Sequence, residues 1–487
     1  MFEAIIVGSG YGGLLPAWRL TQEGAKVLLI ERGGKEDPKQ FRHSWDPLYL
    51  KDFYDFGFST NLMNTYRASR ILGGGSVMNS MMHQRVPSDA FDFCEEDLAG
   101  RRAWPSEANR AALERHYEKV EELLGIHQLS WNEVPQIGGN FARMFNDAGL
   151  SADPARMNIG SGCVHCGFCE AGCRFENAKL TLAGRALREA LATGNLTVRE
   201  QLTAKTIRSK DGDYEVDCVT TGKSFQGGAI DETFRAKRLI VAAGPLGTIP
   251  LLKRSAANLS RLSPSLGQRM NNNGDVNFLF VIPEHYPDHE GYKSTNNAGV
   301  ITYAFWKQHR VTMHPGFSPV AVLAGIDARL DGALPWGLEH KYFVKTHAIH
   351  RMIPVNAMRQ IAPDLSMDID DQGQSRIRVL SEEKSTRHGE FMFGLAKSVA
   401  DRVGGRVMKT GIGKSPLDQG GNHILGGARM SDDPQWGVTD PFGEVWGHPG
   451  LYVTDATNLP STIGINPALT IGANALRIAD HLARNFQ

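Results

Sequence analysis

The chain has 487 residues, which is too long for one ordinary hydrophobic core and predicts two domains. Its 53 lysines and arginines balance 53 aspartates and glutamates, so the charge gives no reason to expect a nucleic-acid-binding protein. The 53 glycines, about 11% of the chain against a usual ~7%, predict many tight turns or close approaches of backbone to a ligand.

The ends and the cysteines predict a cytoplasmic protein. Strand-like residues begin at Phe2, which leaves no room for a secretory signal, and no stretch approaches ~20 apolar residues, so no membrane span is expected. Four of the six cysteines lie within Cys163–Cys173, too close together for a disulfide framework. These features favour a reducing compartment.

The first predicted unit is a strand, a glycine turn, a helix and a second strand. Phe2–Val7 is apolar and β-prone, and Gly8–Gly13 forms the turn. Leu14–Gln22 has helical spacing, and Lys26–Ile30 is the next strand, closed by Glu31. Such a unit belongs to a parallel sheet.

The glycine turn fits G-x-G-x-x-G, a dinucleotide-binding pattern. Gly8 allows the tight turn, Gly10 lets the backbone approach a pyrophosphate, and Gly13 brings helix and strand close together. Gly12 is a further glycine of the same turn. Glu31 is positioned to accept hydrogen bonds from ribose hydroxyls and argues against a 2′-phosphate. The motif alone leaves open whether the nucleotide is FAD or NAD.

The later elements are less regular. A helix is expected over Trp104–Leu124, and a second strand-to-helix unit over Arg238–Leu252. Between about 275 and 380, short strand candidates predict the sheet of a substrate domain. The remaining expected elements are the strands Val276–Ile282, Val320–Ile326 and Leu451–Val453 and the final helix Pro467–Arg484.

A cysteine cluster has the spacing C-x2-C-x2-C-x3-C, which is typical of a bacterial ferredoxin segment. Arg174 stands where the ferredoxin proline would follow. The pattern leaves three alternatives: an iron–sulfur cluster, a zinc ion, or reduced structural thiols. The candidate ligands are Cys163, Cys166, Cys169 and Cys173.

Five further segments carry recognisable motifs: Arg70–Asn79, Ala243–Thr248, His423–Gly427, Leu451–Ala456 and Gly464–Thr470. Together they resemble the glucose–methanol–choline (GMC) oxidoreductases. Their His-x-Leu-Gly-Gly and Asn-Pro forms are most similar to the bacterial cholesterol oxidase branch. The resemblance implies a bound FAD, a sheet domain assembled from several segments, and oxidation of an alcohol.

The expected fold is α/β. A Rossmann-like FAD-binding domain is predicted from 1–100, 175–270 and 405–487. It is interleaved with a substrate domain from 101–174 and 271–404, built on a mostly antiparallel sheet with helices.

Alcohol oxidation by a flavin requires a base for the substrate hydroxyl and a group that holds the reacting carbon over the ring. A neutral imidazole suits the base because it titrates near working pH. The resemblance implies that His423 is the catalytic base. Where relatives often carry a second histidine, this chain has Asn466, whose amide can orient a developing alkoxide but cannot act as a base.

The resemblance also implies the flavin contacts. Gly75, Ser76 and Asn79 are expected along the flavin, and Pro467 at the first turn of the final helix would direct its positive end at the ring. Met78 replaces the histidine that attaches FAD in some relatives, so a noncovalent flavin is expected. The predicted cofactor-binding residues are Gly8, Gly10, Gly12, Gly13, Glu31, Gly75, Ser76, Asn79, Gly244, Asp455, Ala456, Asn466 and Pro467.

Three functional hypotheses follow. The first is an enzyme that oxidises a small-molecule alcohol and passes electrons to oxygen or to a redox partner. The second adds an iron–sulfur cluster that hands electrons to a partner protein, since some sugar dehydrogenases of the family hold a cluster through cysteines that match Cys163, Cys169 and Cys173. The third is a redox-neutral lyase on the same fold. The sequence does not identify the substrate.

Overall fold

The fold is α/β, as expected, and combines a parallel sheet with several antiparallel ones. The computed structural model describes residues 2–61, 65–95, 100–222, 230–317, 338–343, 345, 349–410 and 421–484. None of the helices in these ranges is both long enough and apolar enough to cross a lipid bilayer.

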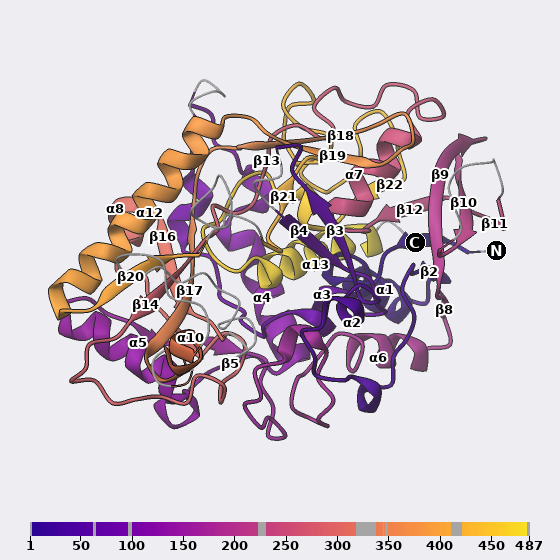
Figure 1. Cartoon of the computed structure of the whole chain (residues 1–487). Coiled ribbons are helices and arrows are strands. Elements are labelled where there is room, and N and C mark those ends of the chain that lie inside the picture. Colours follow the sequence, from indigo (N-terminus) through magenta and orange to yellow (C-terminus); the bar gives the residue numbers. More distant parts are fainter. Residues whose placement is uncertain are drawn as a thin grey trace.

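A five-stranded parallel sheet lies at the centre of one half of the molecule (Figure 1, right). Its strands come from the beginning, the middle and the end of the chain, so one sheet joins distant segments. All residues of the strands 4–7, 27–30 and 451–453 are buried, as expected for a sheet covered on both faces. In spatial order the strands are β22 (Leu451–Val453), β12 (Arg238–Val241), β1 (Ala4–Val7), β2 (Val27–Ile30) and β8 (Leu196–Arg199).

Successive side chains of a strand point to opposite faces of the sheet, so these strands contribute side chains to two apolar layers. Ile6 and Leu29 pack in one apolar cluster with the helices α1 (Tyr11–Gln22), α4 (Arg110–Leu124) and α13 (Ala468–Arg484). The opposite face packs against the helix α7 and an antiparallel three-stranded meander. These elements are α7 (Pro245–Arg254), β9 (Leu202–Lys210), β10 (Asp213–Thr220) and β11 (Glu232–Ala236).

The other half of the molecule contains an antiparallel sheet covered by two helices, α5 (Gln136–Asp147) and α12 (Glu382–Val403) (Figure 1, left). Aromatic and β-branched side chains of the sheet form a separate core with these helices. The strands are, in spatial order, β16 (Val311–Pro315), β17 (Met352–Arg359), β14 (Val276–Val281) and β20 (Arg406–Lys409).

A second four-stranded antiparallel sheet carries the segments that form the site. Asn271 pairs with Leu425 and Met270 with Gly426, which brings the residues after 271 beside those before 425. The order is β19 (Ser375–Val379), β18 (Leu365–Ile369), β13 (Met270–Asn271) and β21 (Leu425–Gly426).

The expected elements are present, with shifted ends. The first helix begins at Tyr11, three residues before the predicted start, because Gly10 is extended and serves as its N-cap. Helix α4 begins only at Arg110, where the Asn109 side chain accepts a hydrogen bond from the Ala112 N–H. The expected strand Val320–Ile326 lies outside the described residues. The domain boundaries remain a prediction.

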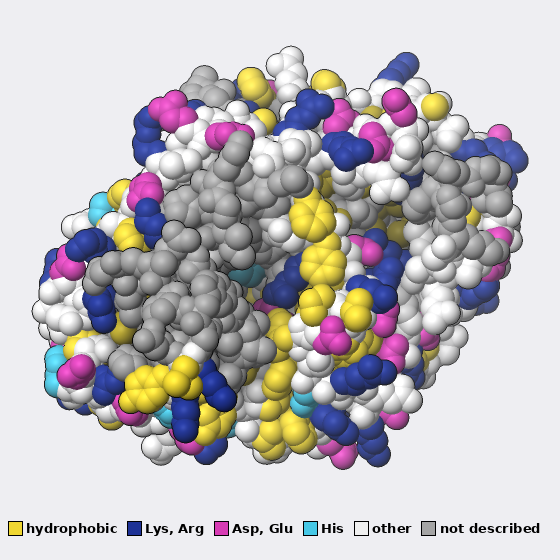
Figure 2. All heavy atoms as spheres, in the orientation of Figure 1, with side chains coloured by type: hydrophobic (Ala, Val, Ile, Leu, Met, Phe, Trp, Pro, Cys, Tyr) yellow, Lys and Arg dark blue, Asp and Glu magenta, His cyan; other side chains and the backbone are white. Residues whose placement is uncertain are grey.

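On the face shown in Figure 2, basic and acidic side chains of the described residues are interspersed. This distribution agrees with the balanced composition of the chain.

Candidate active site

A cavity of about 660 Å³ extends from the carboxyl ends of the parallel strands to the segment around His423. Ligands of open α/β sheets bind at this edge of the sheet. The cavity therefore joins the N-terminal glycine turn to the C-terminal motifs. Eleven of the thirteen predicted cofactor residues line it, together with His423: Gly8, Gly10, Gly12, Glu31, Gly75, Asn79, Gly244, Asp455, Ala456, Asn466 and Pro467.

The glycines of the first turn differ in what surrounds them. A Cβ on Gly8 would lie 2.2 Å from the Ala242 carbonyl oxygen, and one on Gly13 would lie 1.8 Å from the Gly8 carbonyl oxygen. Gly13 therefore serves close packing of helix against strand and does not line the cavity. A Cβ on Gly10, in contrast, would meet no protein atom within 4 Å. The same holds for Gly75 and Gly244.

Glu31 is buried at the end of β2 and is held by protein donors. Its Oε2 accepts hydrogen bonds from the Ser9 N–H (2.9 Å) and hydroxyl (2.6 Å), and its Oε1 accepts one from the Gly33 N–H (2.7 Å). The neighbouring Arg32 forms an ion pair with Asp55. The carboxylate thus fixes the glycine turn and still faces the cavity.

Asp455 ties the second glycine turn to the end of β22. Its Oδ2 accepts hydrogen bonds from the Gly244 N–H (2.7 Å) and the Thr248 hydroxyl (2.5 Å). Its Oδ1 accepts from the N–H (2.9 Å) and hydroxyl (2.6 Å) of Thr457. Burial raises the pKa of the Asp455 carboxyl, and these four donors oppose that effect.

The segment around Asn79 packs directly against the glycine turn, since the Gly73 N–H donates a hydrogen bond to the Ser9 hydroxyl (2.9 Å). The Asn79 amide donates a hydrogen bond to the Tyr11 hydroxyl (3.0 Å), which lies 2.6 Å from Nε2 of the buried His83.

Ser76 was expected along the flavin, but its side chain has a different position. Its hydroxyl donates to the Gly73 carbonyl (2.7 Å) and accepts from the Leu182 N–H (3.2 Å), and Ser76 does not line the cavity.

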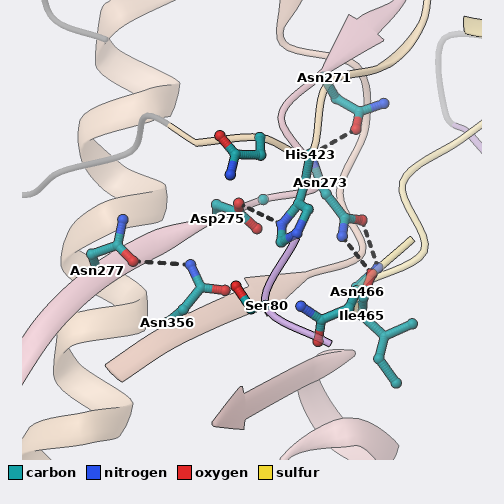
Figure 3. Close-up of polar contacts among 12 residues, drawn as sticks. Ser80, Asn271, Asn273, Asp275, Asn277, Asn356, His423, Ile465 and Asn466 are labelled. Atoms are coloured by element: carbon teal, nitrogen blue, oxygen red, sulfur yellow. Dashed lines mark hydrogen bonds and ion pairs between the residues drawn. The ribbon is translucent and has the colours of Figure 1, made fainter. Parts of the chain in front are cut away.

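His423 lies at the far end of the cavity and forms an ion pair with Asp275, with Nδ1 2.8 Å from the carboxylate (Figure 3). About a fifth of the imidazole is exposed (21%), whereas Asp275 is buried (2%). Burial lowers the pKa of His423, but the charge and hydrogen bond of Asp275 raise it by more, so the net shift is upward. Burial raises the pKa of the Asp275 carboxyl, and His423 opposes this shift.

Asn466 lies on the same wall, just before helix α13. Its Nδ2 is 3.5 Å from Nε2 of His314 on β16, and its Oδ1 is buried without a hydrogen-bond partner among the described residues. Burial lowers the pKa of His314 to about 4, so this imidazole is neutral. The first turn of α13, with Ala468 and Ile471, also lines the cavity and directs the positive helix end toward it.

Asn273 connects the two predicted catalytic segments. Its Oδ1 accepts hydrogen bonds from the N–H groups of Ile463 and Gly464 (both 3.0 Å), and its Nδ2 donates to the Ile465 carbonyl (2.7 Å; Figure 3). Two residues later the same turn supplies Asp275. One short turn therefore fixes both the partner of His423 and the loop that leads to Asn466.

Four residues at or beside the site were not predicted from the sequence: Asp275, Asn273, His314 and Glu170, which also lines the cavity. The run of three asparagines, a glycine and Asp275 matched no recognised motif. His314 lies in a strand that had no recognisable motif, and Glu170 was hidden within the cysteine cluster.

The cysteine cluster lacks the arrangement of a metal site. Where residues are described, no three His, Cys, Asp or Glu side chains are grouped so that they could hold a metal ion. Cys163, Cys166, Cys169 and Cys173 are free thiols. Burial raises the pKa of Cys163 to about 11 and that of Cys169 to about 12, which disfavours thiolates. The geometry gives no support to the iron–sulfur or zinc hypothesis.

Known proteins resemble the chain over nearly its whole length. It is 26% identical to a cholesterol oxidase of Mycobacterium tuberculosis, over 98% of this chain and 90% of the relative. It is 25% identical to a cholesterol oxidase of Acinetobacter baumannii (99% and 94%) and to paromamine 6′-oxidase of Streptomyces fradiae (99% and 91%).

Solved structures share the fold. Pyridoxine 4-oxidase from Mesorbium loti superposes with a TM-score of 0.69 at 16% identity, over 100% of this chain and 99% of that one. An FAD-dependent oxidoreductase from Chaetomium thermophilum gives a TM-score of 0.68 at 14% identity, with the same coverage. The family models for the N-terminal and C-terminal parts of GMC oxidoreductases match residues 2–273 and 369–475. The chain therefore belongs to the GMC oxidoreductase family.

Proposed function

We propose that the protein oxidises the hydroxyl-bearing carbon of a small alcohol, with His423 as the base and noncovalent FAD as the hydride acceptor. The observation that carries this proposal is that His423 and the glycine turn line the same cavity. The fold of the family implies FAD, and bound FAD would accept the hydride. Oxygen or a redox partner would then take up the electrons.

The residues present fit a dinucleotide. Backbone without side chains at Gly10, Gly75 and Gly244 leaves open space on the cavity side, as a pyrophosphate and a flat ring system require. The N-terminal end of helix α1 supplies N–H groups for phosphates, and Glu31 supplies an acceptor for ribose hydroxyls. The start of α13 would stabilise negative charge on the reduced ring.

His423 is suited to remove the hydroxyl proton. The Asp275 carboxylate favours a proton on Nδ1, so the neutral ring presents the lone pair of Nε2. Asp275 also stabilises the imidazolium that forms when Nε2 takes the proton. The carboxylate acts through the imidazole and is therefore a positioning residue.

Asn466 would orient the substrate oxygen. Its amide lies in the cavity wall and can donate a hydrogen bond to the developing alkoxide. Because His314 is neutral, its Nε2 can accept a hydrogen bond from the Asn466 Nδ2. This contact keeps the amide in one orientation.

The test is anaerobic bleaching of the flavin by a panel of alcohols. At least one alcohol should bleach the wild-type flavin, and His423→Ala should retain FAD while bleaching slows strongly. A flavin that no alcohol bleaches would contradict the proposal and favour the redox-neutral lyase.

A further inference from the structure

Glu170 is a carboxylate in the cavity wall for which the proposed reaction has no use. About a tenth of its side chain is exposed (10%), and it lines the same cavity as His423 and Asn466. It comes from the cysteine-rich loop, immediately after the buried Cys169. Burying a charged side chain costs free energy unless other groups compensate it, so the groups around Glu170 indicate its role.

The Glu170 side chain is held by one donor on each oxygen. The Ser80 hydroxyl donates to Oε1, and the Arg67 guanidinium donates to Oε2. Ser80 in turn accepts a hydrogen bond from the Asn296 amide (2.7 Å). A carboxylate oxygen can accept two hydrogen bonds, so each oxygen retains capacity for one more donor.

The backbone of the loop is fixed at the same point. The Tyr54 hydroxyl donates to the Glu170 carbonyl (2.6 Å), and the buried Lys179 ammonium donates to the Cys169 carbonyl (3.1 Å). The Asn296 N–H also donates to the Cys169 sulfur (3.4 Å). The carboxylate is therefore preorganised, which lowers the entropic cost of binding a ligand to it.

The lining of the cavity is mixed. Besides Glu170, its polar side chains include Arg67, Ser80, Asn297 and Asn422, and its apolar ones include Met78, Met82 and Ile424. The Glu170 charge also raises the pKa of His423, which agrees with its nearness to the base. A single apolar body with one hydroxyl would shield the open acceptor positions of the Glu170 carboxylate from water without supplying a donor, at a cost in binding free energy.

We propose that Glu170 recognises the substrate, and that the substrate is an alcohol with a second hydrogen-bond donor, a hydroxyl or an ammonium group, near the carbon that is oxidised. This inference rests on the proposed function. The second donor would occupy one of the remaining acceptor positions of the carboxylate while His423 takes the proton of the reacting hydroxyl.

The test is anaerobic flavin reduction of the holoenzyme by two groups of alcohols. Glycerol, D-glucose and ethanolamine carry a second donor, whereas 1-propanol, cyclohexanol and cholesterol do not. We expect the best member of the first group to reduce the flavin at least about tenfold more efficiently than any member of the second. A comparison of glycerol and glucose with ethanolamine distinguishes recognition of a hydroxyl group from recognition of an ammonium group.

At a pH where His423 is neutral in both proteins, the variant Glu170→Gln should weaken apparent binding of the best substrate about tenfold or more, with little change in the limiting rate and a smaller effect on 1-propanol. Glu170→Asp keeps the charge and should show a smaller loss. Glu176→Gln, an exposed residue of the same loop, is the matched control and should behave as wild type.

The outcomes separate this inference from the proposed function. Efficient reduction by single-hydroxyl alcohols alone, or an equal effect of Glu170→Gln on both groups, would overturn the role of Glu170 and leave alcohol oxidation standing. If no alcohol reduced the flavin, the proposed function would fall and this inference with it.

Discussion

Asp275 and His423 are 148 residues apart in the chain, yet Oδ2 of the carboxylate lies 2.8 Å from Nδ1 of the imidazole. The contact depends on the pairing of β13 with β21, which places the turn after Asn271 beside the residues before Leu425. His423, for which the resemblance implied the role of a single base, is thus one half of an ion pair, and the charge and hydrogen bond of Asp275 raise its pKa.

Asp275→Asn should shift the pH dependence of flavin reduction to lower pH. The base is active when neutral, so in the wild type the rate should rise with pH through a pKa above the ordinary 6.5. Asparagine keeps the size and an acceptor but removes the charge, so burial then dominates and lowers the pKa of His423. We expect the midpoint of anaerobic flavin reduction to fall by about one pH unit or more.

The same substitution predicts a change in stability. A histidine whose folded pKa is raised stabilises the protein below its unfolded pKa, and this contribution is lost as pH rises through the folded value. The difference in unfolding free energy between wild type and Asp275→Asn should therefore be larger at pH 5.5 than at pH 8. Asp371→Asn, at an exposed position, is the control. An unchanged pH profile would show that Asp275 does not govern the base.

His423→Ala should slow anaerobic flavin reduction by about 10²–10⁴-fold, the usual contribution of a general base. FAD should remain bound, because the substitution leaves the glycine turns and Glu31 intact. Rapid-mixing absorbance spectroscopy with the best alcohol measures the rate, and the exposed His285→Ala serves as control. Reduction at the wild-type rate would exclude His423 as the base.

Asn273→Gly should destabilise the protein and disturb Asn466. Three hydrogen bonds to the segment from Ile463 to Ile465 disappear, which corresponds to about 2–4 kcal/mol of unfolding free energy. Glycine tolerates the left-handed backbone of this position (φ 52°), so the substitution adds no backbone strain. Asn273→Ala should lose about 1 kcal/mol more through backbone strain. Denaturant unfolding measures both variants, and equal stability of Asn273→Gly and wild type would contradict the role of the side chain.

The sequence predicted those parts of the site that lie within local motifs. Each of these parts is recognised by its spacing along the chain. They are the glycine turn, the acidic residue after the second strand and the proline at the final helix. The α/β fold and the mixed sheets were also predictable, because alternating apolar strands and glycine turns are local patterns.

The residues that sequence could not identify depend on contacts between distant strands. Asp275 and Asn273 look like ordinary turn residues, and only the β13–β21 register brings them to His423 and Asn466. Glu170 was not recognised among the cysteines around it, whose spacing left open an iron–sulfur cluster, a zinc ion or structural thiols. In the fold, two of these cysteines serve packing and backbone contacts instead: Cys163 packs against the core and Cys169 accepts an N–H.

Gly10→Val separates the needs of the protein from those of the cofactor. The backbone at Gly10 is extended (φ −72°, ψ −163°), which valine adopts readily, and a Cβ there would meet no protein atom within 4 Å. We therefore expect a folded apoprotein that has lost FAD, since the side chain would occupy the path of the pyrophosphate. Flavin absorbance of the purified protein measures the cofactor, and circular dichroism measures the fold.

Gly13→Ala is the contrasting variant, because its Cβ would lie 1.8 Å from the Gly8 carbonyl oxygen and should prevent correct packing of α1 against β1. A Gly10→Val protein with full flavin content would mean that the dinucleotide does not pass over this turn, and the shared cavity would then no longer link FAD to His423.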